Sequence, residues 1–278
     1  SDYRDVRWLG NDFAITTLPA VSSLRALRTL LQSEESLVAF SGFGDPLLEG
    51  EGDCEQRGFA FASLFSRGSV ANVDEVRQLC PLPETADELR SIADSLGAQQ
   101  DSIYIREDAT EGVVKSLDLS GTEVIAFATH GLISGELSGL AEPGLVLTPP
   151  KIGTERDDGI LTASEVAQLD LYPGLVILSA CNTASSDGTP SAEGLSGLAK
   201  AFFYAGSKTL LVSHWAVPSE AAKRLTTGMF AASDADATIG PAEALRRSML
   251  DLMHDEETMY AHPMFWAPFM VVGEGAIH

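Results

Sequence analysis

The sequence has few cysteines and no long apolar run, and each shortage excludes a class of protein. Its cysteines, Cys54, Cys80 and Cys181, are odd in number and show no Cys-x-x-Cys spacing. This pattern argues against a disulfide framework and against a structural zinc site. A reducing compartment, and hence the cytoplasm, fits such a content best. No apolar stretch approaches the roughly 20 residues needed to span a bilayer, so we expect a soluble globular chain without membrane contact.

Basic side chains are also scarce. The chain holds 18 Lys and Arg residues against 40 Asp and Glu residues, which gives a net charge of -22. A surface of that sign repels phosphate backbones and anionic membranes, which argues against nucleic acid as a direct partner. The charge serves either solubility or the attraction of basic protein segments, and composition leaves both readings open. Because Ser1 is preceded by neither an initiator Met nor a leader, we read the chain as a fragment.

The chain does contain enough apolar material for a sizeable core, since 45 % of its 278 residues are hydrophobic. Short apolar runs typical of strands alternate with amphipathic stretches typical of helices, without repeats or a low-complexity linker. This alternation predicts one α/β domain over residues 1–278. We expect strands at residues 12–18, 37–40, 102–105, 124–130, 175–181, 209–213 and 265–272. The stretch 131–150, rich in glycine and proline, is expected to be irregular.

Local signals predict where several helices begin. Thr85 with Glu88, and Thr162 with Glu165, have the Thr-x-x-Glu spacing of a capping box. Ser219 is expected to cap a further helix. The expected helices cover residues 24–31, 85–96, 110–117, 164–169, 193–204, 219–230 and 241–253, the last with Pro241 in its first turn.

Two of the apolar runs end in a residue with a reactive side chain. The first run, residues 124–131, carries His130 at its end, and the second, residues 175–183, carries Cys181. Both runs are short and rich in branched residues, like strands buried on both faces of a parallel sheet. Because ligands bind outside the carboxyl edge of an open α/β sheet, we expect the imidazole and the thiol to face one crevice.

A thiol and an imidazole in that arrangement suit nucleophilic catalysis. The imidazole lowers the pKa of a cysteine thiol and later protonates the leaving group. The backbone N–H groups of Gly131 and Cys181 would then supply an oxyanion hole. The alternative is a buried, inert thiol beside a structural histidine. The matching small-residue settings, Ala-Thr-His-Gly around His130 and Ser-Ala-Cys-Asn around Cys181, favour the catalytic interpretation.

Several motifs in the same order resemble those of the CHAT domain family. The resemblance extends over about residues 12–273, and the agreement of several ordered motifs is far more specific than any one of them. The motifs are Ala-Thr-His-Gly at 128–131, Asp-Gly-Ile-Leu-Thr-Ala-Ser-Glu at 158–165, Leu-Ser-Ala-Cys-Asn-Thr at 178–183, Glu-Gly-Leu-Ser-Gly-Leu-Ala-Lys-Ala-Phe-Phe-Tyr-Ala-Gly at 193–206, Val-Ser-His-Trp-Ala-Val-Pro at 212–218, Ala-Glu-Ala-Leu-Arg at 242–246 and His-Pro-Met-Phe-Trp-Ala-Pro-Phe at 262–269.

The resemblance implies a caspase-like three-layer sandwich, related to separase, with a mostly parallel central sheet flanked by helices. It puts the catalytic base on His130 and the nucleophile on Cys181, with Gly131 and Cys181 donating to the oxyanion. It implies a cysteine endopeptidase that works through an acyl-enzyme and needs neither a metal nor an organic cofactor. Members usually occur in bacteria behind tetratricopeptide or other helical repeats. The implied partners are therefore a protein substrate and a repeat region, the chain's own or an associated one, which activates a latent peptidase.

Two departures from the family pattern stand out. Family members usually begin with a strand and a Pro-containing segment upstream of the position matched by Asp12, and this chain lacks both. We therefore expect a domain without the family's N-terminal strand and upstream repeats. The usual acidic residue after the tryptophan-containing strand is Ser219 here, which we interpret as a changed helix cap.

Substrate contacts are assigned from the resemblance and from charge. In caspase-like enzymes the strand after the nucleophile continues into a segment that pairs with substrate, and Ser213, His214 and Trp215 are similar to it. His214 is read as shaping the pocket rather than as a second base, and Trp215 as either a pocket wall or core. Acidic loops motivate a basic P1 hypothesis, with Asp158 and Asp187 as candidates and Asp157 as a third acid. Solvated loop acids and caps are the alternative.

Two other functions remain open. One is a non-catalytic interaction module that kept the fold. The other is a cysteine hydrolase of small amides, but such enzymes usually show a Gly-x-Cys-x-Gly turn, and Ser-Ala-Cys-Asn-Thr at 179–183 has none.

Overall fold

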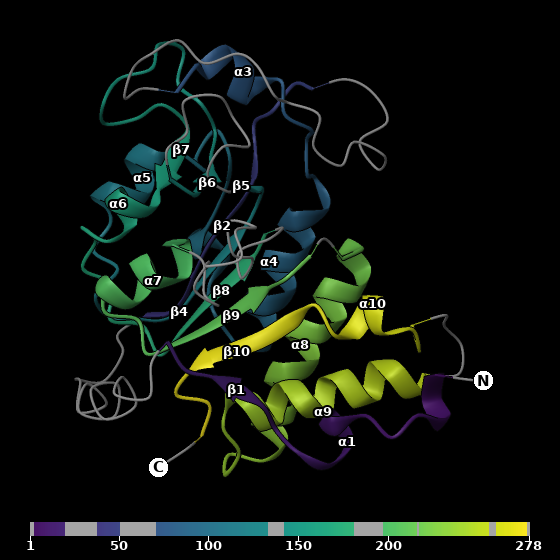
Figure 1. The fold of residues 1–278 in the computed structure, drawn as a ribbon. Helices are drawn as coiled ribbons and strands as arrows, with labels where there is room; N and C mark the ends of the chain where they lie inside the picture. Colours follow the sequence, from purple (N-terminus) through teal and green to yellow (C-terminus); the bar gives the residue numbers. More distant parts are fainter. Residues whose placement is uncertain are drawn as a thin grey trace.

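A seven-stranded sheet lies between two layers of helices in the computed structural model of the chain (Figure 1). The structure describes residues 3–19, 38–50, 71–132, 142–180, 197–215, 217–255 and 260–276. The strands, in the order in which they pair, are β1 (Thr16–Thr17), β10 (Phe269–Gly273), β9 (Thr209–Ser213), β8 (Leu175–Ser179), β4 (Thr122–Ala128), β2 (Val38–Pro46) and β3 (Ile103–Arg106). All neighbours are parallel except β9 with β10.

Helices cover both faces of this sheet. One face packs against α4 (Glu84–Ser95), α8 (Ser219–Ala235), α9 (Pro241–His254) and α10 (Pro263–Trp266). The opposite face packs against α5 (Glu111–Ser116), α6 (Ala163–Val166) and α7 (Gly197–Tyr204). The expected three-layer α/β fold with a mostly parallel central sheet is thereby confirmed. No helix in the described ranges is long and apolar enough to cross a membrane.

The central strands are buried on both faces, as their continuous apolar runs predicted. Along β4, Val124 and Ala126 belong to the core on the α4 side, and Ile125 and Phe127 belong to the core on the α7 side. The Phe127 ring stacks on Phe43, with ring centroids 5.2 Å apart. Full burial of a side chain of this size stabilises the fold by about 2–3 kcal/mol.

A second, small sheet corrects one expectation. Residues 131–150 were expected to be irregular, but they contribute β5 (Gly131–Leu132) and β6 (Gly144–Val146), which pair antiparallel with each other. β6 also pairs with β7 (Ile160–Thr162), and these strands pack near the helix α3 (Val73–Arg77) in a separate apolar cluster. Strands this short carry no readable alternation, so their pairing depends on tertiary contacts that the sequence pattern does not show.

The first and last expected strands, residues 12–18 and 265–272, are shorter in the structure, and a helix precedes each of them. A 3₁₀ turn at Tyr3–Asp5 and the helix α1 (Leu9–Asp12) come first, and β1 has only two residues. At the other end, Pro263 opens α10 and His262 caps it by accepting from the Met264 N–H, so β10 begins only at Phe269. A further 3₁₀ turn lies at Gln100–Ser102, and the helix expected at 24–31 lies outside the described residues.

Of the two expected capping boxes, only the one at Thr162 and Glu165 is confirmed. The other is wrong, because α4 begins after Pro83 without a side-chain cap. The Thr85 hydroxyl instead accepts a hydrogen bond from the Asp45 N–H at 2.8 Å and donates to a carbonyl. Ser219 is likewise not a cap, since α8 begins after Pro218 and the Ser219 hydroxyl donates to the Glu84 carboxylate at 3.1 Å. α4 is thus tied to β2 and α8, and its first turns lie near the carboxyl edge of the sheet.

Candidate active site

The site is organised by the register of the two central strands. β4 and β8 run parallel, and their last pair is Ala128 with Ser179. Both residues face α4, since Ala128 belongs to the core on that side and Ser179 binds Glu88 of α4. His130 follows Ala128 by two residues. Cys181 follows Ser179 by two residues and lies outside the described ranges.

The His130 ring is partly buried and held by a backbone carbonyl. Its Nε2 lies 2.7 Å from the carbonyl oxygen of Cys80. A carbonyl only accepts hydrogen bonds, so Nε2 carries the hydrogen and the neutral ring keeps its lone pair on Nδ1. Burial lowers the pKa of His130 below its usual value, against the opposing effects of the Cys80 carbonyl and the Glu84 charge. The ring is therefore neutral near pH 7, with a fixed tautomer, as a general base requires.

Cys80 itself departs from the expectation of free thiols. Its sulfur is part of a disulfide, and its partner is not among the described residues. Cys80 lies between α3 and α4, and the Leu79 carbonyl just before it accepts from the Gly50 N–H at 3.1 Å. Reading the cysteine count as evidence against disulfides was thus wrong for this position. The contact between its carbonyl and His130 was not foreseen, because a backbone acceptor leaves no mark in the sequence.

Glu88 was expected to cap the N-terminus of its helix, but its side chain lies buried against the sheet. Its side chain is 2 % exposed, and its Oε2 accepts a hydrogen bond from the Ser179 hydroxyl at 3.1 Å. Its other oxygen, Oε1, is buried without a hydrogen-bond partner. Burial raises the pKa of Glu88 to about 7. The spacing that puts Glu88 beside the buried Leu89 and one turn before Ile92 was the signal that it faces inward.

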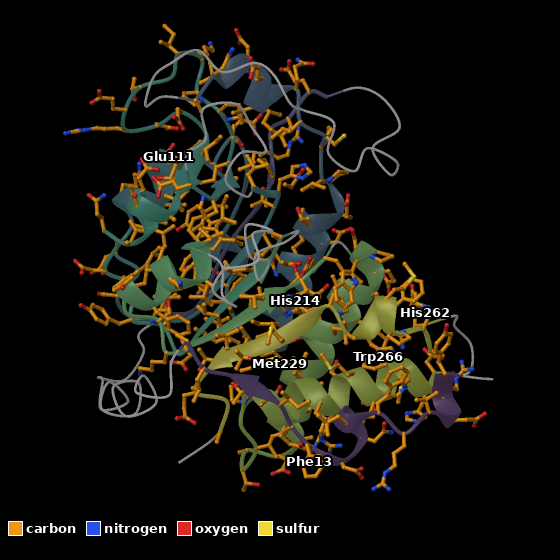
Figure 2. The ribbon with its side chains drawn as sticks, in the orientation of Figure 1. Phe13, Glu111, His214, Met229, His262 and Trp266 are labelled. Atoms are coloured by element: carbon orange, nitrogen blue, oxygen red, sulfur yellow. The ribbon has the colours of Figure 1, made fainter. Side chains whose placement is uncertain are left out.

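The end of β9 lies next to the end of β8. The Ser213 hydroxyl donates to the Ala180 carbonyl at 2.5 Å. Nε2 of His214 lies 2.7 Å from the Met270 sulfur, and Figure 2 shows His214 beside β10. Burial lowers the pKa of His214. Trp215 is 39 % exposed, and its ring N–H donates to the Met264 carbonyl at 3.0 Å. This segment therefore offers a partly exposed indole beside the strand ends.

The acidic candidates lie elsewhere or outside the described residues. The Asp158 carboxylate accepts hydrogen bonds from the N–H groups of Ala71 and Ile160, and the Asp158 N–H donates to Glu111. Figure 2 shows Glu111 well away from His214. Backbone N–H groups also donate to Asp157. Asp187 lies outside the described ranges, and Gly131 opens β5 opposite Leu145. The structure thus does not bring Asp158 to the segment around His214.

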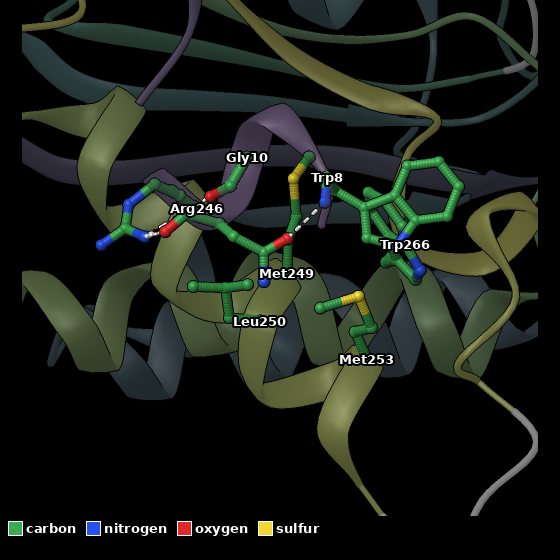
Figure 3. A pocket seen from close by; sticks show the side chains of 8 residues that line it. Trp8, Gly10, Arg246, Met249, Leu250, Met253 and Trp266 are labelled. Carbon is green, nitrogen blue, oxygen red and sulfur yellow. Dashed lines mark hydrogen bonds between the residues drawn. The ribbon is translucent and has the colours of Figure 1, made fainter. Parts of the chain in front are cut away.

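A hollow beside the N-terminal helix contains none of the candidate catalytic residues (Figure 3). Its charged side chain, Arg246, binds the Glu243 carboxylate and the Asn11 carbonyl. Trp8 packs edge-on against Trp266, with ring centroids 5.4 Å apart. The hollow is lined by Trp8, Gly10, Asn11, Arg246, Met249, Leu250, Met253 and Trp266. Within the described ranges, no three His, Cys, Asp or Glu side chains gather as metal ligands would.

Two solved structures share part of the architecture at low similarity. One is the Arg-specific cysteine proteinase gingipain R, with a TM-score of 0.45 and 11 % identity, covering 68 % of this chain and 41 % of that one. The other is the structure of a protease, with a TM-score of 0.39 and 14 % identity, covering 57 % of this chain and 36 % of that one. Similarity at this level carries no conclusion about chemistry.

Sequence comparison is more specific. Tetratricopeptide repeat protein 28 from Homo sapiens is 29 % identical over 231 residues, covering 69 % of this chain and 8 % of the relative. The same protein from Mus musculus is 28 % identical over 231 residues, covering 69 % of this chain and 9 % of the relative. The chain thus spans less than a tenth of the length of these relatives. The CHAT domain model matches residues 1–274. That match covers nearly the whole sequence, and the chain belongs to the CHAT domain family.

Proposed function

We propose that the chain is a caspase-like cysteine endopeptidase with Cys181 as nucleophile and His130 as general base. The observation that carries the proposal is the pairing of Ala128 with Ser179. Side chains alternate along a strand, so residues two positions further on return to the same face. Neighbouring strands are about 4.8 Å apart. Continuation of both strands for two residues would therefore put the imidazole and the thiol side by side.

The reaction then follows from the atoms available. Nδ1 of His130 takes the proton of the Cys181 thiol, and the sulfur attacks the peptide carbonyl carbon. The N–H groups of Gly131 and Cys181 donate to the oxyanion of the tetrahedral intermediate. The C–N bond breaks as the imidazolium returns its proton to the leaving amine, which leaves a thioester. A water molecule, deprotonated by His130, hydrolyses that thioester and releases the thiol.

The Cys80 carbonyl plays the part that an aspartate plays in a Ser-His-Asp triad. It accepts the hydrogen of Nε2 and so keeps the basic lone pair on Nδ1, the nitrogen that must face the nucleophile. As a neutral dipole it stabilises the imidazolium less than a carboxylate would. The charge of Glu84, which raises the pKa of His130 against the larger effect of burial, adds to that stabilisation.

Substrate would bind along the end of β9. Ser213 already pairs with Phe269, and the His214 N–H already donates to the Pro268 carbonyl. An extended peptide would therefore contact this segment on the side facing away from β10, and the partly exposed Trp215 would form a wall of the pocket. A preference for a basic P1 residue is proposed from the overall acidity and from Asp187, because the Asp158 carboxylate is already held by the N–H groups of Ala71 and Ile160. Cleavage of a peptide library tests it, because a profile dominated by acidic or apolar P1 residues would remove it.

Regulation by a helical-repeat region is part of the proposal. Both relatives are named as tetratricopeptide repeat proteins, and the present chain matches only a small part of their length. We infer that residues 1–278 form the peptidase domain beside such a region, which activates it. Because catalysis needs a free thiol, the active form belongs to a reducing compartment such as the cytoplasm.

A non-catalytic interaction module is the second candidate. Apolar side chains of the N-terminal segment are exposed, with Leu9 at 64 % and Phe13 at 61 %. Exposed apolar side chains close together mark surfaces that bind other proteins. A scaffold of this kind would retain the fold and the apolar surface without needing a reactive thiol.

An active-site-directed thiol probe distinguishes the two functions. The protein is first reduced, and modification of each cysteine is followed by peptide mapping in the wild type and in His130→Ala. An endopeptidase shows preferential labelling of Cys181 that is lost in the variant. Equal labelling of Cys54, Cys80 and Cys181, unchanged in the variant, would indicate a scaffold. Digestion of a peptide library by the wild type, but not by Cys181→Ala, then identifies the substrate class.

A further inference from the structure

A row of small residues crosses the sheet at its carboxyl edge. Gly44 of β2 pairs with Ala128 of β4, which pairs with Ser179 of β8. α4 packs closely on this row, since a Cβ added at Gly44 would lie 2.8 Å from the Leu89 side chain. Glu88 of α4 reaches the Ser179 end of this row, where its Oε2 accepts a hydrogen bond from the Ser179 hydroxyl.

Glu88 is an unfavourable choice for stability alone. Its carboxyl group is removed from water, one of its oxygens has a single hydrogen bond, and the other has none. A buried polar atom without a partner destabilises the folded state relative to an apolar side chain of the same size. Leu89 and Ile92, on the same face of α4, are fully buried. An apolar side chain at position 88 would therefore fit its surroundings. A role beyond packing would explain the carboxyl group.

The hydrogen bond between Glu88 and Ser179 indicates that Glu88 holds the end of β8 in place. Two hydroxyl hydrogen bonds hold the end of β8, one between Ser179 and Glu88 and one from Ser213 to the Ala180 carbonyl. They come from opposite neighbours, the helix α4 and the strand β9. Together they set the position and the direction of the chain as it leaves the sheet, immediately before residue 181.

We propose that Glu88 is a positioning residue that holds the Ser179 hydroxyl and thereby fixes the end of β8 from which the nucleophile extends. This inference rests on the proposed function. Glu88 touches no reacting atom and acts through the backbone of residues 179–180. A displacement of the nucleophile by about 1 Å is enough to slow its reaction by one to two orders of magnitude.

The test measures the rate at which iodoacetamide alkylates Cys181 in the reduced protein, followed by peptide mapping. Glu88→Leu keeps the volume and removes the acceptor, Glu88→Gln keeps an acceptor oxygen, and Ser179→Ala removes the donor. Asp87→Asn, on the exposed side of the same helix, is the matched control. Thermal unfolding of every variant is recorded beside the rate, and alkylation of Cys54 serves as the internal reference.

We expect Glu88→Leu and Ser179→Ala each to slow alkylation of Cys181 about tenfold, because a thiol displaced from the His130 ring ionises less readily. The double variant should be no slower than the slower single one, because both changes remove the same contact. Glu88→Gln should stay within about threefold of the wild type, since it restores the acceptor. Glu88→Leu should unfold at the same temperature as the wild type or higher, so that reactivity falls while stability does not.

Three results would overturn the inference. An unchanged rate in Glu88→Leu and Ser179→Ala would do so while leaving the proposed function intact, provided that His130→Ala still slows alkylation. A rate that falls only in step with the unfolding temperature, without rescue by Glu88→Gln, would reduce Glu88 to a packing role. Alkylation of Cys181 that does not depend on His130 would remove the proposed function and this inference together.

Discussion

Ala128 and Ser179 are paired across β4 and β8, and each stands two residues before a member of the proposed dyad. This equal offset matters because a parallel register keeps residues two positions ahead on one face and at one level. A shift of one residue in either strand would turn one side chain to the opposite face. The pairing is therefore the structural basis for treating His130 and Cys181 as one site.

The tautomer of His130 is the first prediction. Because the Cys80 carbonyl accepts from Nε2, we expect the neutral ring to carry its hydrogen on Nε2 and not on Nδ1. Long-range nitrogen–proton NMR of the reduced protein, labelled at histidine, distinguishes the two forms at pH 7 to 8. A ring protonated on Nδ1 would contradict the assignment of Nδ1 as the base. The exposed His254 of α9 serves as the contrasting ring, because its Nδ1 lies 2.8 Å from the Leu250 carbonyl oxygen and is expected to carry the hydrogen there.

The pH dependence of stability tests the burial of Glu88. Burial raises the pKa of Glu88 from 4.5 to about 7, so the folded state binds its proton more tightly than the unfolded state does. The resulting stabilisation is fully present below pH 4.5 and is lost as the pH rises to 7. Over that interval the loss amounts to roughly 3 kcal/mol.

Glu88→Gln removes this titration. We expect the free energy of unfolding of the wild type to fall relative to that of Glu88→Gln between pH 5 and pH 8, by an amount on the order of 2–3 kcal/mol. Urea unfolding at a series of pH values measures the free energy of unfolding of each protein. If the free energy of unfolding changes with pH by the same amount in both proteins, Glu88 is not buried as an isolated carboxyl group.

The close approach of α4 to the sheet makes Gly44 sensitive to substitution. A Cβ there would lie 2.8 Å from the Leu89 side chain of α4 and 2.7 Å from the Ala128 carbonyl oxygen of β4, whereas a Cβ at Gly10 would meet nothing within 4 Å. We expect Gly44→Ala to lower the free energy of unfolding by about 1–3 kcal/mol. Gly10→Ala should be neutral or slightly stabilising, because it only gains helix propensity. Equal effects of the two substitutions, measured by urea unfolding, would refute the packing described at the sheet edge.

Trp215 and Trp266 should respond differently to truncation. Trp215 is 39 % exposed, so Trp215→Ala should change the free energy of unfolding by less than about 1 kcal/mol. It should raise KM for peptide cleavage and leave kcat nearly unchanged, as expected when only ground-state binding is lost. Trp266→Ala, in the core, should cost about 3 kcal/mol or more in stability. A fall in kcat without a rise in KM for Trp215→Ala would argue against a wall of the substrate site.

The central strands of the sheet were predictable from the sequence, because they are continuous apolar runs. Residues 124–128 and 175–179 are buried on both faces, and such runs identify central parallel strands with little ambiguity. The order of the motifs then identified the family. β5, β6 and β7 were not foreseen as a sheet, because strands of two or three residues form only when distant segments pair.

The details of the site were less predictable. Thr85 and Glu88 have the spacing of a capping box, but tertiary partners use both side chains: Thr85 binds the Asp45 N–H, and Glu88 binds Ser179. A local signal was thus overridden by contacts across the sheet. The acceptor for His130 is a backbone carbonyl, which no residue type announces. The available signal for the contacts of Thr85 and Glu88 was that both polar residues lie on the face of α4 that carries the buried Leu89.

The pH dependence of Cys181 alkylation, compared between the reduced wild type and His130→Ala, tests the central claim most directly. It requires neither a known substrate nor the activating partner. If the imidazole lies beside the sulfur, Cys181 of the wild type reacts with iodoacetamide well below the pH at which an ordinary thiol ionises, and His130→Ala moves the midpoint up toward that pH. Identical midpoints in the two proteins, at the pH of an ordinary thiol, would contradict the account.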